Sequence, residues 1–261
     1  MRLITSKQLF KIFQGEDLEF RITEYALKFQ DSAKFEGLIF PHDLNFKDSF
    51  LGEISFKNCK FLGDITIKNS TVSQLNFEGC QFKNVIIKGS QLDQVSLKSA
   101  KQLQKFHIGS SSLNNANIEG NKTFEALELG CENHIISANI VGNGNFKNRQ
   151  STIYICPEKF ESMVLKNNVS EVLHIGTIGE YASFEIDNYA ANLFLFSNCT
   201  STSSQVSFKD MLPKDPSNGS VCIVNSANIL ELHEKGLFRD FKKVRKFRQM
   251  DEYYQLGGIA S

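Results

Sequence analysis

One ten-residue stretch of the sequence decides the fold: Leu75-Asn76-Phe77-Glu78-Gly79-Cys80-Gln81-Phe82-Lys83-Asn84. It begins with an apolar-x-apolar triplet, which puts both apolar side chains on one face of a β-strand, because side chains alternate along a strand. A polar, turn-prone pair follows, and a small residue, Cys80, then precedes Phe82 by two positions. The stretch therefore predicts a short strand, a corner and a second inward-facing pair.

The same triplet recurs along the chain at a nearly constant spacing. From residue 44 onward, its third members are Phe46, Phe56, Ile67, Phe77, Ile87, Leu97, Ile108, Ile118, Leu129 and Ile140. Each step between them is 10 or 11 residues long. A second, offset set of apolar residues lies between these triplets, two positions after small residues such as Cys59, Ser70 and Cys80. The combined period, close to five residues, is typical of a repeat architecture.

Cys59 and Phe61 are repeated 21 residues later as Cys80 and Phe82. This distance fits one coil of four short sides, so we expect Cys59 to stack on Cys80 and Phe61 on Phe82 at the strand spacing of about 4.8 Å. The triplets continue beyond residue 140 with longer excursions between them. At about 21 residues a coil, residues 18–232 would form on the order of ten coils, a rod roughly 50 Å long.

These segments resemble pentapeptide-repeat proteins. The resemblance covers residues 44–130 and implies a right-handed parallel β-helix with four short sides per coil, in which a small residue and then Leu or Phe point inward. The chain departs from that pattern because every second side begins with a large inward residue: Ile54, Ile65, Leu75, Val85 and Val95. A square cross-section and a wider one therefore both stay open.

An antiparallel β-sandwich also accommodates strands at ten-residue spacing. It needs hairpin turns, whereas repeated Asn-Gly or Asp-Gly pairs are absent, and the polar pairs after the triplets suit single-residue left-handed corners. The sequence thus favours an all-β solenoid, a right-handed parallel β-helix, over residues 18–232. Residues 1–17 are expected to cap it, since 5–13 fit one or two helical turns or an edge strand.

A basic segment follows the solenoid, and we expect an amphipathic α-helix and tail over residues 233–261. Apolar residues recur there at helical spacings of three and four, namely Leu237, Phe238, Phe241, Val244 and Phe247. The basic residues expected on the opposite face are Arg239, Lys242, Lys243, Arg245, Lys246 and Arg248. Seven basic and four acidic residues between 234 and 252 give this segment a charge of +3, which leaves −3 for the rest of the neutral chain.

Two interpretations of this segment stay open. In the first, the apolar stripe closes the open end of the solenoid and the basic residues face solvent. In the second, the basic helix binds an anionic membrane surface, nucleic acid or an acidic partner. The resemblance adds that a comparable charged helix leads into transmembrane segments in some bacterial pentapeptide-repeat proteins.

The sequence contains no recognisable catalytic or metal-binding motif. Its five histidines are scattered, and its six cysteines form no CxxC pair. The middle positions of the first ten triplets include a single acid, Glu128, whereas β-helical enzymes that cleave polysaccharides need clustered carboxylates. We therefore expect no catalytic residue, cofactor, metal or small-molecule substrate, and a β-helical carbohydrate-active enzyme is the least favoured alternative.

These observations favour a non-enzymatic scaffold or protein-interaction module. Its terminal helix would mediate self-association or bind a protein partner. The alternative is a membrane-associated or nucleic-acid-mimicking regulator that acts through this helix or the rod surface. Because 29 basic and 29 acidic side chains balance, a wholly acidic mimic is disfavoured and nucleic acid is not an expected partner. No apolar stretch fits a signal peptide or a membrane span, so we expect a cytoplasmic protein, at most peripheral to a membrane.

Overall fold

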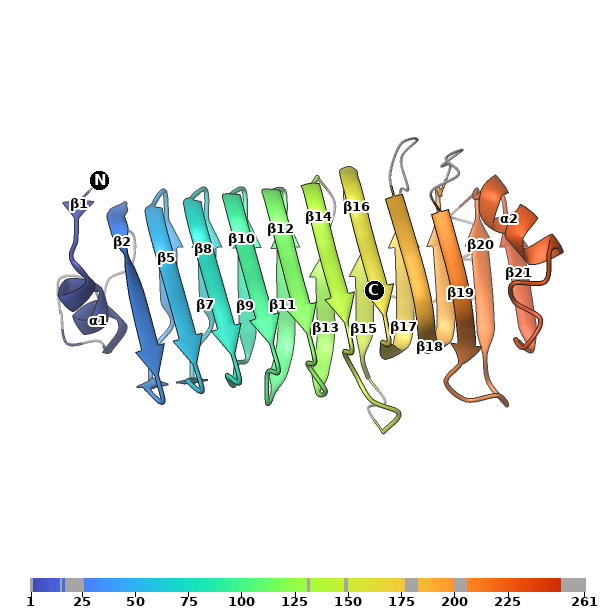
Figure 1. The fold of residues 1–261 in the computed structure, drawn as a ribbon, viewed down its shortest axis with the longest axis horizontal. Helices are drawn as coiled ribbons and strands as arrows, with labels where there is room; N and C mark the ends of the chain where they lie inside the picture. The colour runs from blue at the N-terminus through green and yellow to red at the C-terminus, as the bar shows by residue number, and fades with distance from the viewer. Residues whose placement is uncertain are drawn as a thin grey trace.

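The computed structural model describes residues 2–14, 16, 26–130, 132–147, 150–176, 183–199 and 206–249. These residues form a right-handed parallel β-solenoid of about ten turns, with a short helix at each end (Figure 1). Successive strands pair in parallel with the strand one coil further along the chain. The predicted solenoid is thereby confirmed, and the antiparallel sandwich is excluded.

Each coil contributes one strand to a front stack and one to a rear stack (Figure 1). The front stack contains β2 (Leu27–Glu36), β5 (Phe50–Lys57), β8 (Thr71–Glu78), β10 (Gln91–Lys98), β12 (Ser112–Glu119), β14 (His134–Val141), β16 (Lys159–Lys166) and β19 (Val206–Pro213). The rear stack contains β4 (Leu44–Lys47), β7 (Ile65–Lys68), β9 (Asn84–Lys88), β11 (Leu103–Gly109), β13 (Phe124–Leu129), β15 (Thr152–Ile155), β17 (Val169–Gly176), β20 (Ser220–Val224) and β21 (Lys243–Phe247). The long strand β18 (Ser183–Ser197) belongs to both stacks, because it pairs with β16 and then with β17. Three short strands complete the set: β1 (Arg2–Leu3) beside β2, and the pair β3 (Ile39–Phe40) and β6 (Lys60–Phe61).

The inward side chains stack coil upon coil, as the repeat predicts. A parallel bridge at the neighbouring residues sets Cys59 beside Cys80, and both thiols are buried. The rings of Phe61 and Phe82 lie nearly parallel, with their centroids 5.1 Å apart. Such aromatic pairs contribute about 0.5–1.5 kcal/mol beyond the burial of their area. The expected stacking is therefore confirmed in the region that carries the repeat.

The corners between strands adopt the left-handed conformation that the polar pairs predict. Asn58, Asn69, Gly79 and Gly89 have φ angles of 51°, 49°, 62° and 59°. Asn and Gly tolerate this region better than other residues, because Gly lacks a Cβ and Asn bonds locally. These left-handed residues thus turn the chain at each corner without reversing its direction, as a hairpin would.

Small polar residues line the inner corners in columns. The hydroxyl of Ser70 donates to the carbonyl of Lys68 at 2.7 Å, and its oxygen accepts a bond from the backbone N–H of Ser49 in the preceding coil at 3.0 Å. Each buried hydroxyl therefore satisfies backbone groups of two coils. Side chains that accept a backbone N–H of the preceding coil recur at Ser90, Ser111, Asn121, Asn143 and Asn168.

Helix α1 (Ser6–Gln14) covers the N-terminal end of the core. Its Leu9 and Phe13 are fully buried, and the ring of Phe13 lies 5.0 Å from that of Phe35 on the first front strand. Of the helix and edge strand considered for residues 5–13, the helix is correct. The coil expected to start at residue 18 begins outside the described residues, and the first described front strand starts at Leu27.

Candidate binding surface at the C-terminal end

The C-terminal end of the solenoid differs from the predicted helix. Helix α2 spans Ala227–Glu234, a turn with Gly236 at φ 91° follows, and Lys243–Phe247 forms strand β21. The prediction of a helix through Lys243–Phe247 was therefore wrong, and residues 250–261 lie outside the described residues. The physical reason is the edge of β20. Its free backbone groups form hydrogen bonds with an added strand, whereas a short helix at this position would leave them unpaired.

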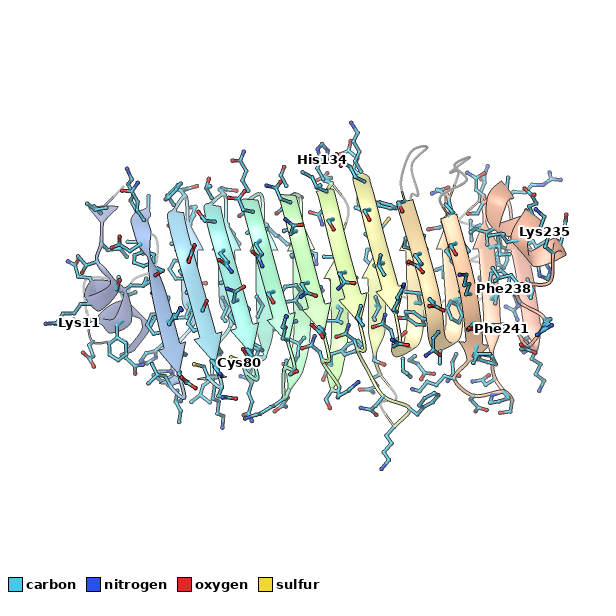
Figure 2. The ribbon with its side chains drawn as sticks, in the orientation of Figure 1. Lys11, Cys80, His134, Lys235, Phe238 and Phe241 are labelled. Carbon is cyan, nitrogen blue, oxygen red and sulfur yellow. The ribbon has the colours of Figure 1, made fainter. Side chains whose placement is uncertain are left out.

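The apolar residues of this segment lie over the last coil. Phe238 is 1 % exposed and Phe241 is 8 % exposed. The ring of Phe238 lies 5.9 Å from that of Phe196, and the ring of Phe241 meets that of Phe194 edge-on at 5.3 Å. Figure 2 shows both labelled rings at the C-terminal end of the rod, with Lys11 at the other end. They cover the end of the core in the way that α1 covers its start.

The remaining apolar residues lie at the margin of this cap. Leu237 and Val244 are half-buried and pack against the main core. Phe247 is also half-buried, but it packs against a separate cluster formed by Leu195, Cys222 and Val224. The predicted stripe is thus divided between two surfaces, because Phe238 and Phe241 sit in a turn and Val244 and Phe247 sit in a strand.

Strand β21 carries basic side chains on both of its faces. Its register aligns Lys243 with Ser220 and Arg245 with Cys222 on the outward face of the rear stack, whereas Lys246 aligns with the inward Ile223. All three basic residues are exposed. Within the described residues, β21 pairs with β20 alone, so its other edge faces the end of the rod. A short basic strand with one open edge results.

The surroundings of β21 are also basic. Between residues 239 and 248, six basic side chains face one acid, Asp240, which lies 3.8 Å from the Arg239 guanidinium. A recess of about 140 Å³, lined by residues 217–220 together with Lys242 and Lys243, adjoins the strand. Lys242 donates from its ammonium group to the carbonyl of Ser217 at 3.2 Å. The prolines at positions 213 and 216 indicate a loop in this part of the sequence, but nothing in the sequence indicates that the loop meets Lys242.

The clearest polar cluster elsewhere lies on the outer surface of the rear stack. The Nδ1 atom of His107 and the ammonium group of Lys105 each lie 2.7 Å from a carboxylate oxygen of Glu128. Burial raises the pKa of Glu128, but the hydrogen bonds from His107 and Lys105 outweigh it, so this pKa lies below its ordinary value. In the part of the chain that the structure describes, no group of three or more His, Cys, Asp or Glu side chains could hold a metal ion.

A scan against protein-family models found no match for this chain, and searches of curated proteins and of solved structures found none either. The likeness to pentapeptide-repeat proteins therefore stands on the repeat itself and on the solenoid geometry.

Proposed function

We propose that this chain is a non-enzymatic protein-interaction scaffold of the pentapeptide-repeat type, whose C-terminal edge strand binds an extended acidic segment of another protein. The observation that supports this proposal is β21, a basic strand at the end of a rigid rod that pairs along one edge only among the residues that the structure describes. An exposed edge accepts another strand through backbone hydrogen bonds, and flanking side chains select its sequence.

The hydrogen-bond pattern indicates which backbone groups a bound strand would meet. The carbonyl of Phe247 accepts a bond from the N–H of Asn225, so it points toward the solenoid. Because backbone groups alternate along a strand, those of Val244 and Lys246 point toward the open edge. A partner strand would therefore bond to these two residues while its acidic side chains lie beside Lys243, Arg245 and Lys246.

The charge of the two ends favours a different protein over a second copy. Helix α1 at the N-terminal end contains Lys7 and Lys11 and no acidic residue. A head-to-tail contact would bring these lysines toward β21, and a tail-to-tail contact would bring two basic strands together. Like charges in an interface cost free energy, so an acidic partner fits better.

The membrane alternative loses its structural basis at β21. Binding in the bilayer interface by an amphipathic helix needs a continuous apolar helical face, whereas Lys243–Phe247 is a strand. No helix in the described part of the chain is long and apolar enough to cross a membrane. Anionic vesicles are therefore a competing outcome of the test rather than the expected ligand.

The test compares two full-length variants with the same change in charge. Lys243→Glu, Arg245→Glu and Lys246→Glu together alter the edge, while Lys47→Glu, Lys68→Glu and Lys88→Glu alter a basic row on the rear stack. The probe is a fluorescent peptide of alternating Glu and Thr, measured by anisotropy. We expect the edge variant to bind it at least about tenfold more weakly and the row variant within about twofold of the parent.

A backbone variant separates strand addition from simple charge attraction. Val244→Pro removes an N–H from the open edge and leaves every charge in place. Strand addition predicts weaker peptide binding by this variant. Equal binding by all the variants would overturn the proposal, as would binding to phosphatidylserine vesicles without binding to the peptide.

A further inference from the structure

The outward face of the front stack carries a row of charges that alternate in sign from coil to coil (Figure 1). Parallel pairing aligns the last outward residue of each front strand, so these side chains follow one another at about 4.8 Å along the rod. From β2 to β12 they are Glu36, Lys57, Glu78, Lys98 and Glu119, which we call the charged row. Val141 on β14 ends the alternation.

A second row on this face alternates with the same period. It lies two positions before the charged row on each strand, and its aligned residues are Ser55, Asn76, Ser96 and Asn117. We call these four residues the middle row, in which hydroxyl and amide groups alternate. Asn139 ends this alternation on β14, the same strand on which Val141 ends the other.

Contacts within one copy account for only part of this pattern. Lys57 lies 3.9 Å from Glu78, and Lys98 lies 3.4 Å from Glu119, yet these four side chains stay between 44 % and 61 % exposed. The solenoid does not require alternation, because its rear stack aligns three lysines in successive coils: Lys47, Lys68 and Lys88. An uncharged row needs it even less, so the shared period of both rows favours contact with a surface of the same period.

We propose that two copies of this chain bind face to face through their front stacks, related by a two-fold axis parallel to the strands between β8 and β10. Such an axis reverses the order of the coils and places each row opposite the same row of the second copy. Glu78 then faces the second copy's Lys98, and Lys57 faces the second copy's Glu119. The two-fold axis repeats both pairs, so four unlike charge pairs form.

The middle row matches under the same axis. Each serine faces an asparagine of the second copy, since Ser96 lies opposite Asn76 and Ser55 lies opposite Asn117. A hydroxyl and an amide can each donate and accept a hydrogen bond, so these pairs are complementary. A recess of about 380 Å³ along both rows leaves room for bridging water molecules.

The break in both rows at β14 determines the position of the axis. An axis between β10 and β12 would place Lys57 opposite the second copy's Lys166, which follows Val141 in the charged row, and like charges in an interface cost free energy. An axis between β5 and β8 also opposes unlike charges, but only four front strands overlap. The axis between β8 and β10 overlaps six, from β2 to β14. Strand β21 lies outside this overlap, so the proposal does not depend on the one for β21.

The overlapping area is sufficient for a dimer. Strands β5, β8, β10, β12 and β14 are each eight residues long. At about 3.3 Å per residue and about 4.8 Å between strands, six such strands present roughly 750 Å² per copy. Specific interfaces bury about 800 Å² per partner. Because exposed ion pairs contribute little and are screened by salt, we expect weak association that depends on ionic strength.

Reversing charges in the full-length chain tests the contact. The acidic variant, Lys57→Glu with Lys98→Glu, and the basic variant, Glu78→Lys with Glu119→Lys, each leave one sign of charge at the four opposed positions. Sedimentation velocity at about 50 mM salt measures association, and circular dichroism checks the fold. We expect the dissociation constant of each variant alone to rise at least about tenfold, and an equimolar mixture to return within about threefold of the parent, because it restores all four pairs.

A matched control separates facing charges from net charge. Lys68→Glu with Lys88→Glu makes the same change in charge as the acidic variant, but on the rear stack. Alone, it should dimerise within about twofold of the parent. It should bind the fluorescently labelled basic variant at least about tenfold more weakly than the acidic variant does.

Five outcomes would overturn the proposal. The parent could stay monomeric at about 1 mM protein, or its association could be the same at about 50 mM and about 500 mM salt. The acidic and basic variants could each dimerise as tightly as the parent, which would place the interface elsewhere. Their mixture could fail to recover association. The rear-stack control could replace the acidic variant in the mixture, which would leave only attraction between net charges.

Discussion

Replacing Asn143 by alanine tests the polar column most directly. The side chain of Asn143 is fully buried, and its Oδ1 accepts the backbone N–H of Asn121 at 3.0 Å and the side-chain amide of Asn121 at 2.8 Å. Its own amide group donates to the carbonyl of Ile118 at 2.9 Å and to Oδ1 of Asn168 at 3.1 Å. Asn143→Ala removes all four bonds at once and leaves their partners inside the core.

The expected loss of stability follows from the groups left behind. The backbone N–H of Asn121 loses its acceptor, which costs about 1–3 kcal/mol for a buried donor. The loss of the donor to the Ile118 carbonyl adds about 1 kcal/mol. Asn168 and the Asn121 amide group retain other partners, so they add little. We expect Asn143→Ala to lower the free energy of unfolding by about 3 kcal/mol.

A graded pair of variants makes this test specific. Asn143→Ser restores a short acceptor of the kind found at Ser70, so its loss should be about half as large. Asn139→Ala is the control, because Asn139 is exposed and its amide donates to Oδ1 of Asn117 at the long distance of 3.4 Å, so a loss below about 0.5 kcal/mol is expected. Urea unfolding followed by circular dichroism measures the losses, and hydrogen exchange at the Asn121 amide locates them. The reasoning fails if alanine at 143 costs no more than alanine at 139, or if serine is no better than alanine.

Two further predictions concern the core and the rear face. The ring of Phe77 stacks on that of Phe56 at 5.3 Å and meets that of Phe82 edge-on at 4.9 Å. Phe77→Ala should therefore lower the free energy of unfolding by about 4 kcal/mol, measured by urea unfolding. Phe146→Ala is the control, because Phe146 is exposed. Equal losses of stability in the two variants would contradict the role of the stacked rings. Burial lowers the pKa of His174 to about 4, so between about pH 6.5 and 4 the unfolded chain binds a proton that the folded chain does not. The free energy of unfolding should fall by up to about 3 kcal/mol as the pH falls across that range. His174→Asn should make it depend less on pH, as measured by urea unfolding at pH 7, 5.5 and 4. An unchanged pH dependence in this variant would show that His174 is not its source.

The inward half of the fold could be predicted because its signal is periodic. Inward positions recur in every coil, as Cys59 and Phe61 do at Cys80 and Phe82, and each recurrence stacks one inward side chain on another. The left-handed corners followed for a similar reason, since Asn and Gly are the residues that such corners accept. Repetition therefore carried the prediction of coil, register and core.

The C-terminal end could not be predicted because the same spacing suits two structures. Phe238, Phe241, Val244 and Phe247 are three residues apart, which fits a helical stripe as well as a turn followed by a strand. The edge of β20 decides between them, and that edge exists only once the solenoid has formed. Tertiary structure thus overrides local pattern at this end.

The burial of the outward side chains Leu195, Cys222 and Val224 did leave a signal in the sequence. Residues 194–196 and 221–224 are uninterrupted apolar runs, whereas most of the earlier triplets have a polar residue in the middle. An unbroken run is typical of a strand buried on both faces. The triplet pattern alone does not distinguish these strands, because it considers only the first and third residues of each triplet.

The columns of polar side chains imply an order in which the coils of the solenoid are completed. The N–H of Ser49, Ser70, Asn121 and Asn143 is each satisfied by a side chain of the following coil, never of the preceding one, among the bonds described above. A coil leaving the ribosome therefore stays incomplete until about 20–25 further residues have followed it. At about 5–20 residues per second, each coil waits on the order of one to five seconds for its successor, so the growing end of the nascent chain is its vulnerable point.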